Sequence, residues 1–582
     1  MKEISDQVRG VIFVVVAMLF FVVWSYFFKP PVTPPQQKPG PAAQTSPTQT
    51  PAPPQTAAAP ATAAAAPAPT VAQASEEKTF VLESPLYRVE LSNRGGVVRS
   101  WKLKKYFDDQ KPPHALELVN VDAAQQLGWP FSLILSDGQL ETQANAALFK
   151  SEIAQARAGA RADAPLVAAI PAEGAHIEAP AVVNFHWSDG HLDVTKQLKF
   201  NKDYELAVEV NVTLDGKPMP AAIAWRGGFG DQAVYKASTL VNVFYKLNGK
   251  LATLQSKNLG VPKNQGQSVV QAGPLEFTGI EDQFFCAAFL PDGTDLSLWH
   301  WTQDHNVTVD DKPASEPIAE MAAGSPLAVP VKMRVFVGPK DLDLLAREKP
   351  PLEELVQFGW FGIIAKPLLL ILQWIQRYVP NWGWAIVVLT LIINMLMFPL
   401  KMKSWRSMQK MQKVMPEIRS IQDRYKKYSM SDPRKRKMNE EVTAIYQREG
   451  INPMGSCLPM LFQMPIWLAL WRVLNGAIEL RHASWIGWIK DLSAMDPYYI
   501  LPIGMTITMY LTTKMTPQTS ADPAQQKMMA LMPLMMGFFF FRLSSGLNLY
   551  MFTSNIVAVG QQLYLNRAEP LPAKGKFKKK KE

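Results

Sequence analysis

The chain has 582 residues, of which 48% are hydrophobic, and its 60 lysines and arginines against 50 aspartates and glutamates give a net charge of +10. This hydrophobic share excludes a wholly disordered chain, and the presence of only two cysteines excludes a small disulfide-stapled module. The mean hydropathy of −0.04 does not exclude a membrane protein, because a polar domain and apolar spans cancel in an average.

The charge is sorted into blocks along the chain. Residues 29–358 carry 29 basic and 36 acidic side chains, a net charge of −7. Residues 401–458 carry 14 and 6, a net charge of +8, and residues 567–582 carry 7 and 2, a net charge of +5. Because multi-pass membrane proteins keep their basic loops in the cytoplasm, this pattern indicates a membrane protein.

The first apolar run, residues 11–28, is uncharged and has about the length that crosses a bilayer core. It ends at Lys29-Pro30-Pro31 without a small-residue cleavage site, so we interpret residues 1–28 as a transmembrane anchor and not as a signal peptide. Residues 29–78 are rich in proline and alanine, which predicts a semi-rigid spacer.

Residues 79–345 predict an external all-β domain. Stretches of alternating polarity are separated by turn dipeptides at 137–138, 189–190, 215–216, 248–249 and 292–293. The size and punctuation favour one large β-sandwich. It shows no catalytic constellation; His186 and His191 flank one turn, but two histidines without a third ligand favour a surface position over a metal site.

The rest of the chain predicts membrane helices. Residues 352–380 are apolar with interfacial tryptophans, which indicates an amphipathic helix in the outer interface of the bilayer. Five spans follow at 382–400, 458–478, 498–513, 528–541 and 546–565; residues 381–400 form the second transmembrane helix and residues 458–565 the other four. With the N-terminus in the cytoplasm, both basic blocks lie inside, and the opposite orientation would export them.

Residues 401–457 predict a cytoplasmic helical hairpin. Apolar residues, among them Met408, Met411 and Met415, recur every three or four positions, as on one face of a helix. Ser431-Asp432-Pro433 predicts the start of a second helix. The apolar seam is open to two interpretations: it forms the core of the hairpin, or its methionines contact varied hydrophobic segments of other proteins.

The five C-terminal spans contain no aspartate or glutamate, which argues against a transporter, and the chain has no Walker A, HExxH or GxSxG motif. The spans do contain polar residues, including Thr390 and Asn394, Gln463, Arg472 and Asn475, and Tyr550 and Ser554. Thr390 and Asn394, four residues apart, share a helix face, as do Tyr550 and Ser554. These side chains either bond neighbouring helices or line a hydrated groove.

Several motifs occur in order in this half of the chain: Ile451-Asn452-Pro453-Met454-Gly455-Ser456-Cys457-Leu458-Pro459, Gln463-Met464-Pro465-Ile466, Asp491-Leu492-Ser493, Asp496-Pro497-Tyr498-Tyr499-Ile500-Leu501-Pro502 and Ser545-Gly546-Leu547. Together they resemble the YidC membrane protein insertase family, Gram-negative type, over essentially the whole chain. The resemblance implies a multi-domain membrane protein with six transmembrane α-helices, five of which form an insertase core, and a periplasmic all-β supersandwich.

The resemblance also implies a function. Such a protein is not an enzyme and needs no cofactor; it inserts, folds and helps assemble bacterial inner-membrane proteins, here called clients, alone or with the Sec translocon. Its other expected partners are the ribosome and inner-membrane phospholipids, not DNA, and both termini are cytoplasmic. A hydrophilic groove open to cytoplasm and lipid lowers the cost of moving a client's polar flank. The groove residues expected here are Thr390, Asn394, Gln463, Trp467, Tyr550 and Ser554.

The sequence departs from the family at position 394. The family has an arginine of the groove at this position, and this chain has Asn394. We expect a less cationic groove, in which Asn394→Arg retains or improves insertion of clients with acidic tails; Arg472 either compensates or reaches the outer interface. The residues 566–582 form a basic tail whose lysines can contact ribosomes or anionic lipid: Lys574, Lys576, Lys578, Lys579, Lys580 and Lys581. The alternative function is a membrane-anchored periplasmic protein that binds a sugar or a peptide.

Overall fold

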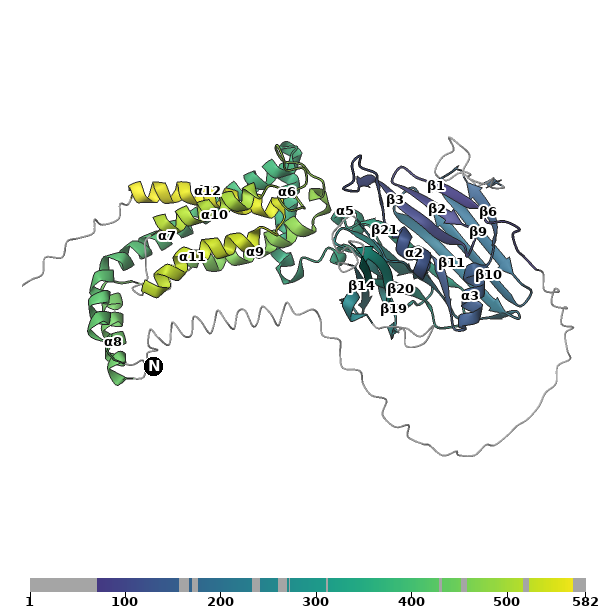
Figure 1. Ribbon diagram of the computed structural model, residues 1–582, viewed down its shortest axis with the longest axis horizontal. Coiled ribbons are helices and arrows are strands. Elements are labelled where there is room, and N and C mark those ends of the chain that lie inside the picture. The colour runs from purple at the N-terminus through teal and green to yellow at the C-terminus, as the bar shows by residue number, and fades with distance from the viewer. Residues whose placement is uncertain are drawn as a thin grey trace, which may run out of the picture. The chain divides into compact units, whose positions relative to one another are not determined.

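The computed structural model describes residues 71–155, 167–169, 176–232, 241–259, 269–271, 273–309, 312–428, 432–451, 458–516 and 523–568. These residues fall into two units (Figure 1): a β unit of residues up to 339 with 348–350, and a helical unit of residues 340–347 and 351 onward. The predicted anchor at 1–28 and the lysines between 574 and 581 lie outside the described residues.

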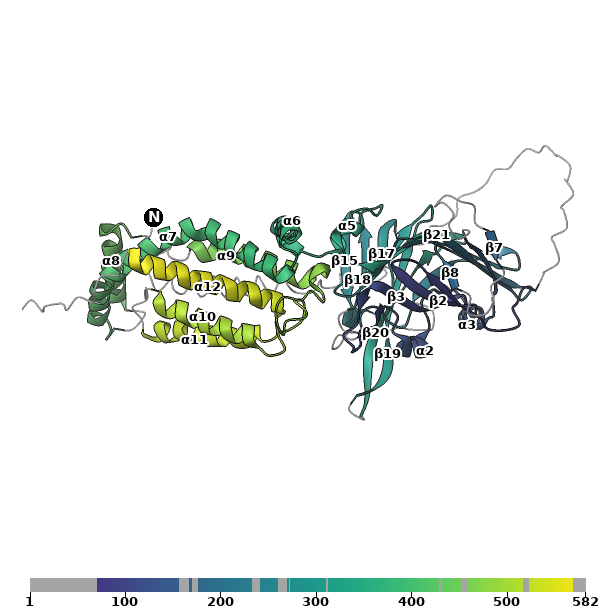
Figure 2. The same cartoon turned by 90° about the horizontal axis from the view of Figure 1, so that it is seen from above.

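The β unit consists of three sheets with the strand orders β4-β3-β2-β1-β8, β15-β14-β17-β18-β21-β11-β10-β9-β6-β7 with β12 beside β11, and β16-β19-β20-β13-β5. Its strands are β1 Thr79–Glu83, β2 Tyr87–Ser92, β3 Val97–Phe107, β4 Ala115–Glu117, β5 Ser132–Leu135, β6 Lys150–Gln155, β7 Val167–Ala169, β8 His176–Glu178, β9 Ala181–Ser188, β10 Leu192–Phe200, β11 Glu205–Leu214, β12 Lys217–Pro218, β13 Ala221–Trp225, β14 Asn242–Leu247, β15 Lys250–Gln255, β16 Val269–Gln271, β17 Leu275–Glu281, β18 Phe285–Pro291, β19 Ser297–Val309, β20 Lys312–Ser325 and β21 Val331–Pro339. The long β19 and β20 pair projects beyond the other strands of this unit (Figure 2). This arrangement confirms the predicted all-β, sandwich-like domain.

Most of the predicted turns connect antiparallel strands. Asn248 and Gly249, with φ of 51° and 72°, join β14 to β15, as a two-residue hairpin turn requires. Asp137-Gly138 was expected to be a turn and is instead the start of helix α3, Gly138–Ala146, because the Asp137 carboxylate accepts hydrogen bonds from the backbone N–H groups of Gln139 and Leu140. An aspartate before glycine fits a helix N-cap as well as a turn.

The two histidines considered as metal ligands each contact their own carboxylate. His186 Nε2 lies 2.9 Å from Asp193 Oδ2, and His191 Nδ1 lies 2.8 Å from Asp215 Oδ1. The Asp215 carboxylate raises the pKa of His191. These pairs occupy the surface of the sheet, where an imidazole beside a carboxylate is an ordinary polar contact.

The helical unit contains α5 Leu342–Leu345, α6 Gly362–Tyr378, α7 Trp382–Arg424, α8 Pro433–Arg448, α9 Leu458–Gly476, α10 Ile500–Met515, α11 Pro523–Phe540 and α12 Ser545–Ala568. Figure 1 shows α7 and α9 to α12 lying side by side, with α8 at one end of the bundle. By length and composition, two described helices are suited to cross a membrane, at 359–378 and 382–424, and the apolar stretch Met528–Phe540 is shorter.

The helix α6 occupies the region predicted to lie in the interface. It buries one face, including Leu368, Leu369 and Leu372, against α7 and α9. The opposite face exposes Ile363 and Trp374, which are 88% and 55% exposed, and Trp360, in the turn before the helix, is 92% exposed. An apolar helix with an exposed aromatic face is typical of contact with a membrane interface.

The predicted hairpin forms from the second half of α7 and from α8. No break separates it from the predicted span at 381–400, since α7 is one helix of 43 residues. Ile418, Ile421, Val442 and Ile445 lie in the hairpin core. Met411 and Met415 lie in the same core, so the first of the two interpretations of the apolar seam describes them; Met408 is half-buried.

The loop between α9 and α10 packs over the end of the bundle that is remote from α8. There Gly383 of α7 leaves room for Trp485, whose Cγ would lie 2.3 Å from any Cβ at position 383. The Asn381 Nδ2 donates to the carbonyls of Ser484 and Trp485, and the Gly546 N–H donates to the Leu492 carbonyl at 2.8 Å. The loop therefore fixes the starts of α7 and α12 relative to each other.

Candidate functional site

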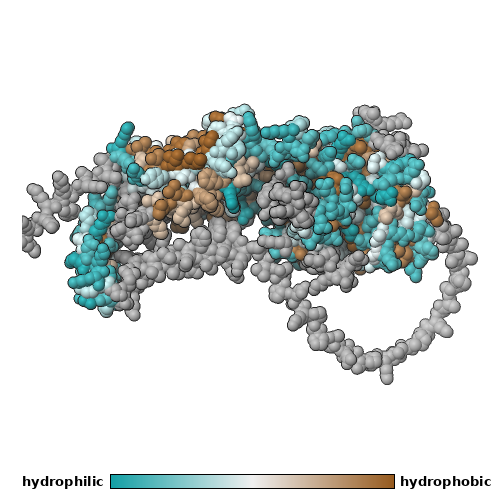
Figure 3. All heavy atoms as spheres, in the orientation of Figure 1, coloured by the Kyte–Doolittle hydropathy of each residue, from teal (hydrophilic) through white to brown (hydrophobic). Residues whose placement is uncertain are grey.

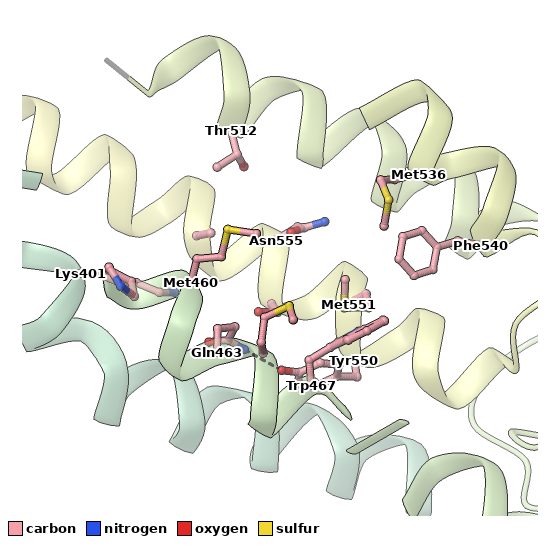
Figure 4. Close-up of a pocket in the computed structure, with 14 residues that line it drawn as sticks. Lys401, Met460, Gln463, Trp467, Thr512, Met536, Phe540, Tyr550, Met551 and Asn555 are labelled. Atoms are coloured by element: carbon pink, nitrogen blue, oxygen red, sulfur yellow. Dashed lines mark hydrogen bonds between the residues drawn. The ribbon is translucent and has the colours of Figure 1, made fainter. Parts of the chain in front are cut away.

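A cavity of about 550 Å³ lies between the helices of the bundle. Its lining, shown in Figure 4, comprises Lys401 of α7, Pro459, Met460, Gln463, Met464 and Trp467 of α9, Thr512 of α10, Met536 and Phe540 of α11, and Tyr550, Met551, Ser554, Asn555 and Ala558 of α12. Four of these residues are methionines, whose flexible side chains adapt to differently shaped partners.

The structure brings four of the six predicted groove residues together in this cavity. Gln463 and Trp467 follow each other by one turn of α9, and Tyr550 and Ser554 do the same on α12, so each pair shares a face. The two faces meet where Gln463 Nε2 donates a hydrogen bond to the Tyr550 hydroxyl at 2.9 Å (Figure 4). This bond joins α9 to α12 and holds the Gln463 and Tyr550 side chains at the cavity wall.

The other two predicted residues, Thr390 and Asn394, are fully buried and are not among the residues that line the cavity. The Thr390 hydroxyl donates to the Ile386 carbonyl of its own helix at 2.7 Å. Asn394 Nδ2 donates to the Thr390 carbonyl at 2.9 Å and to Ser554 Oγ at 3.2 Å. Their shared face packs against α12 instead of facing the cavity.

Sequence reasoning missed Lys401, because it was counted with the basic block that begins at that position. The Lys401 ammonium reaches back along α7 and donates to Asn394 Oδ1 at 2.9 Å and to Gln561 Oε1 at 3.1 Å. Asn394 and Lys401 are seven residues apart, which is about two helical turns. That spacing was the available signal that both residues lie on one face.

Lys401 also changes the expectations for Asn394 and Arg472. An arginine at position 394 would meet the Lys401 ammonium, so Asn394→Arg would not fill a vacant place in the groove. Arg472 is absent from the lining; its guanidinium carbon lies 5.2 Å from the centre of the Trp471 ring. Of the fourteen described lining residues, only Lys401 is charged.

The outer surface of the bundle is strongly apolar, as the brown areas over the helical unit show in Figure 3. Exposed residues include Leu396 of α7 at 78%, Ile507 of α10 at 55% and Met535 and Phe538 of α11 at 72% and 75%. Exposed apolar surface on this scale indicates contact with a membrane or another protein. The cavity is thus a partly polar space inside a bundle with an apolar exterior.

Two family models match the chain: one described as 60Kd inner membrane protein over residues 374–572 and one described as YidC periplasmic domain over residues 79–371. A protein of Geotalea uraniireducens named membrane protein insertase YidC is 31% identical over 571 residues, covering 97% of this chain and 99% of that protein. A Wolinella succinogenes protein of the same name is 46% identical over 237 residues, covering 41% of this chain and 43% of that protein. A crystal structure of an active YidC insertase aligns with 86% of this chain and 95% of its own at 17% identity and a TM-score of 0.35.

Proposed function

The chain belongs to the YidC family of membrane protein insertases, and from that premise we propose that clients enter the membrane through the cavity between α9 and α12. As a member of this family the protein is a membrane-inserted insertase and not an enzyme, and it has a periplasmic β domain and a helical core. The observation that carries the proposal is the cavity itself, because it places polar side chains and one ammonium inside an apolar bundle.

The physical reason for such a route is the cost of polar groups in hydrocarbon. A charged side chain at the bilayer centre costs roughly 2.5–3.5 kcal/mol on insertion scales, and a polar cavity shortens the distance over which that cost applies. Four methionines in the lining accommodate clients of different shape. Burial of the client's apolar helix in lipid then supplies the free energy, at about 0.8 kcal/mol per CH₂.

The proposed topology has six spans: the anchor at 1–28, α7, α9, α10, α11 and α12, with both termini and the α7–α8 hairpin in the cytoplasm. Its support is the net charge of +8 at 401–458, from 14 basic and 6 acidic residues, which the positive-inside rule assigns to the cytoplasm. The exposed apolar faces of α7, α10 and α11 face lipid in this arrangement, and α6 lies in the outer interface.

We assign partners by chemistry and charge. Met408, which is half-buried and is not part of the hairpin core, is the remaining candidate for a cytoplasmic client contact. The lysines between Lys574 and Lys581 suit phosphate groups of ribosomal RNA or of anionic lipids. Cooperation with the Sec translocon follows from the family and is proposed on that ground alone.

A photo-crosslinking experiment tests the route. With a photoreactive residue at Gln463, a ribosome-stalled client should crosslink, because Gln463 lines the cavity. The same probe at Thr390, which is fully buried behind the wall, should give no crosslink and serves as the control. A client that inserts normally yet never crosslinks from Gln463 would show that it takes another route.

A further inference from the structure

We propose that the cavity of the client-free protein binds one phospholipid of the cytoplasmic leaflet, with its phosphate at Lys401 and an acyl chain along the apolar lining toward Phe540. A client then enters by displacing this lipid. The inference rests on the proposed route through the cavity and adds a ligand of the resting protein to it. The lipid binding itself is measured without a client.

The first argument is the order of the lining. Lys401, the one charged residue among the described lining residues, lies at one side of the cavity, and Met536 and Phe540 lie at the opposite side (Figure 4). Eight of the fourteen described lining residues are apolar. A ligand that is charged at one end and hydrocarbon over the rest of its length complements this order, and a phospholipid is such a ligand.

The second argument is the depth of Lys401 in the proposed topology. The α7 helix carries no charge from Trp382 to Leu400, and this stretch rises about 28 Å at about 1.5 Å per residue, close to the roughly 30 Å of a hydrocarbon core. Lys401 is therefore the first charged residue at the cytoplasmic end of the span, next to the phosphates of that leaflet. A lipid reaches it without moving its phosphate to the bilayer centre.

The third argument is the hydrogen-bonding capacity of the ammonium group. An ammonium has three N–H donors, and Lys401 uses two of them, to Asn394 Oδ1 at 2.9 Å and to Gln561 Oε1 at 3.1 Å. Among the described residues the third donor has no acceptor. A phosphate oxygen accepts a charge-assisted hydrogen bond, which is about twice as strong as one between neutral groups.

The fourth argument is access from the bilayer. Met460 of α9 lines the cavity and is itself exposed, as are its neighbours Leu461 and Phe462. On α11 the exposed Phe538 lies two residues before Phe540 of the lining. An acyl chain can thus pass from the surrounding lipid into the cavity without crossing water. Its entry also supplies contacts to apolar walls that would otherwise lack them.

The test measures the phospholipid that stays bound to the purified full-length protein. After extraction from liposomes of phosphatidylglycerol and phosphatidylethanolamine, native mass spectrometry should show one phospholipid per wild-type chain. Lys401→Gln should retain about tenfold less, the loss expected for one hydrogen bond to a charged group, and Lys401→Arg should retain the lipid because a guanidinium also binds phosphate. The matched control is Lys403→Gln, which removes an exposed charge from the same helix and should retain the lipid.

Two further measurements separate the phosphate contact from the space. Glucosyl diacylglycerol, which has the acyl chains without a phosphate, should not be retained by wild type. Ala558→Phe puts a ring into the cavity without changing a charge, and it should also lose the lipid. Equal retention by Lys401→Gln and wild type, or retention of the glycolipid, would overturn the phosphate contact. Retention by Ala558→Phe would place the lipid outside the cavity and overturn the inference.

Displacement by a client has its own measurement. A phospholipid with a photoreactive acyl chain should crosslink to the α9 peptide that contains Met460, and a ribosome-stalled client should lower this crosslink. An unchanged lipid crosslink while the client crosslinks from Gln463 would show that lipid and client occupy different spaces, and it would overturn the displacement. Failure of the proposed route appears separately, as a missing client crosslink from Gln463 in a protein that still retains its lipid.

Discussion

Two buried ionisable residues of the β unit, Lys196 and Glu320, are held by neutral hydrogen-bonding partners, as Lys401 is in the helical unit. The Lys196 ammonium donates to the carbonyls of Gly95 at 2.7 Å and Phe131 at 2.9 Å, with Gly96 at 3.4 Å. The Glu320 carboxyl group accepts hydrogen bonds from the Gly227 backbone N–H and the Trp301 indole N–H. Burial lowers the pKa of Lys196 and raises the pKa of Glu320, each to about 7.

The Glu320 pKa gives the β unit a pH-dependent stability. Since it is raised from 4.5 to about 7, the folded unit binds a proton more tightly than the unfolded chain does. The contribution of Glu320 to the free energy of unfolding is therefore complete below pH 4.5 and is lost as the pH rises through 7. Glu320→Gln should remove this dependence on pH. The difference in melting temperature between wild type and variant, taken as wild type minus variant, should therefore decrease from pH 5 to pH 7.

Thermal unfolding of the purified full-length protein at several pH values measures that difference. Glu178→Gln is the control, because it makes the same substitution at an exposed position of β8. A constant difference for Glu320→Gln would mean that the buried carboxyl group does not titrate in this range.

At the residue scale, helical periodicity predicted which side chains share a helix face: Tyr550 and Ser554 are four residues apart and lie on one face of α12. The family resemblance implied that these two residues, with Gln463 and Trp467, line a groove, and all four line the cavity. Periodicity does not say which neighbour that face meets, and α12 covers the face of Asn394. The Lys401 side chain was missed for a second reason: a long lysine side chain folds back along its helix toward polar atoms, so its position in the chain does not give the position of its charge.

At the scale of elements, the α7–α8 hairpin is a two-helix structure whose stability depends on a small core. Ile418 is 1% exposed and packs in that core with Met415 and Val442. Ile418→Ala should cost about 2–5 kcal/mol, as large-to-small changes in cores do. Hydrogen–deuterium exchange should then rise in α8 and in α7 beyond Met411, while the rest of α7 keeps its protection.

Met408→Ala is the comparison, because Met408 is half-buried and is outside the cluster that forms the core. It should leave exchange in the hairpin near the wild-type level. If Met408→Ala nevertheless reduced insertion, the proposed client contact would gain support. Unchanged exchange in Ile418→Ala would contradict the assignment of the core.

Local sequence signals predicted an element correctly where the residues favoured one backbone structure. They failed where the same residues fit two structures. Asn248-Gly249 and Asp215-Gly216 adopt the positive φ angles that hairpin turns require. Asp137-Gly138 carries the same signal, yet Asp137 caps a helix because the two backbone N–H groups that follow need an acceptor. The continuity of α7 was equally hidden, since the charge pattern changes at Lys401 while the helix continues to Arg424.

At the scale of the whole molecule, the chain divides into two units, and the cavity and the β domain are formed by different parts of the sequence. All fourteen described lining residues lie between positions 401 and 558. The last strand of the β unit, β21, pairs with both β11 and β18 and buries Val331, Val335 and Val337 completely. A truncation that stops at residue 330 would therefore expose an apolar strand with no partners, and this strand belongs with the β unit in any deletion.

Deletion of residues 71–339 should leave an insertase. Its activity in liposomes, measured with a client whose tail carries no charged residue, should be within about twofold of wild type, because burial of the client's apolar helix supplies the free energy. Deletion of residues 79–330 is the informative comparison, because it leaves an unpaired apolar strand, which templates aggregation. In size-exclusion chromatography the variant with this shorter deletion should elute as aggregates. The variant with the longer deletion should elute as a single species. If the variant with the longer deletion folded and yet inserted no client, the activity would depend on the β domain, as the alternative function of an anchored periplasmic binding protein predicts. Retained insertion assigns the activity to the helical unit.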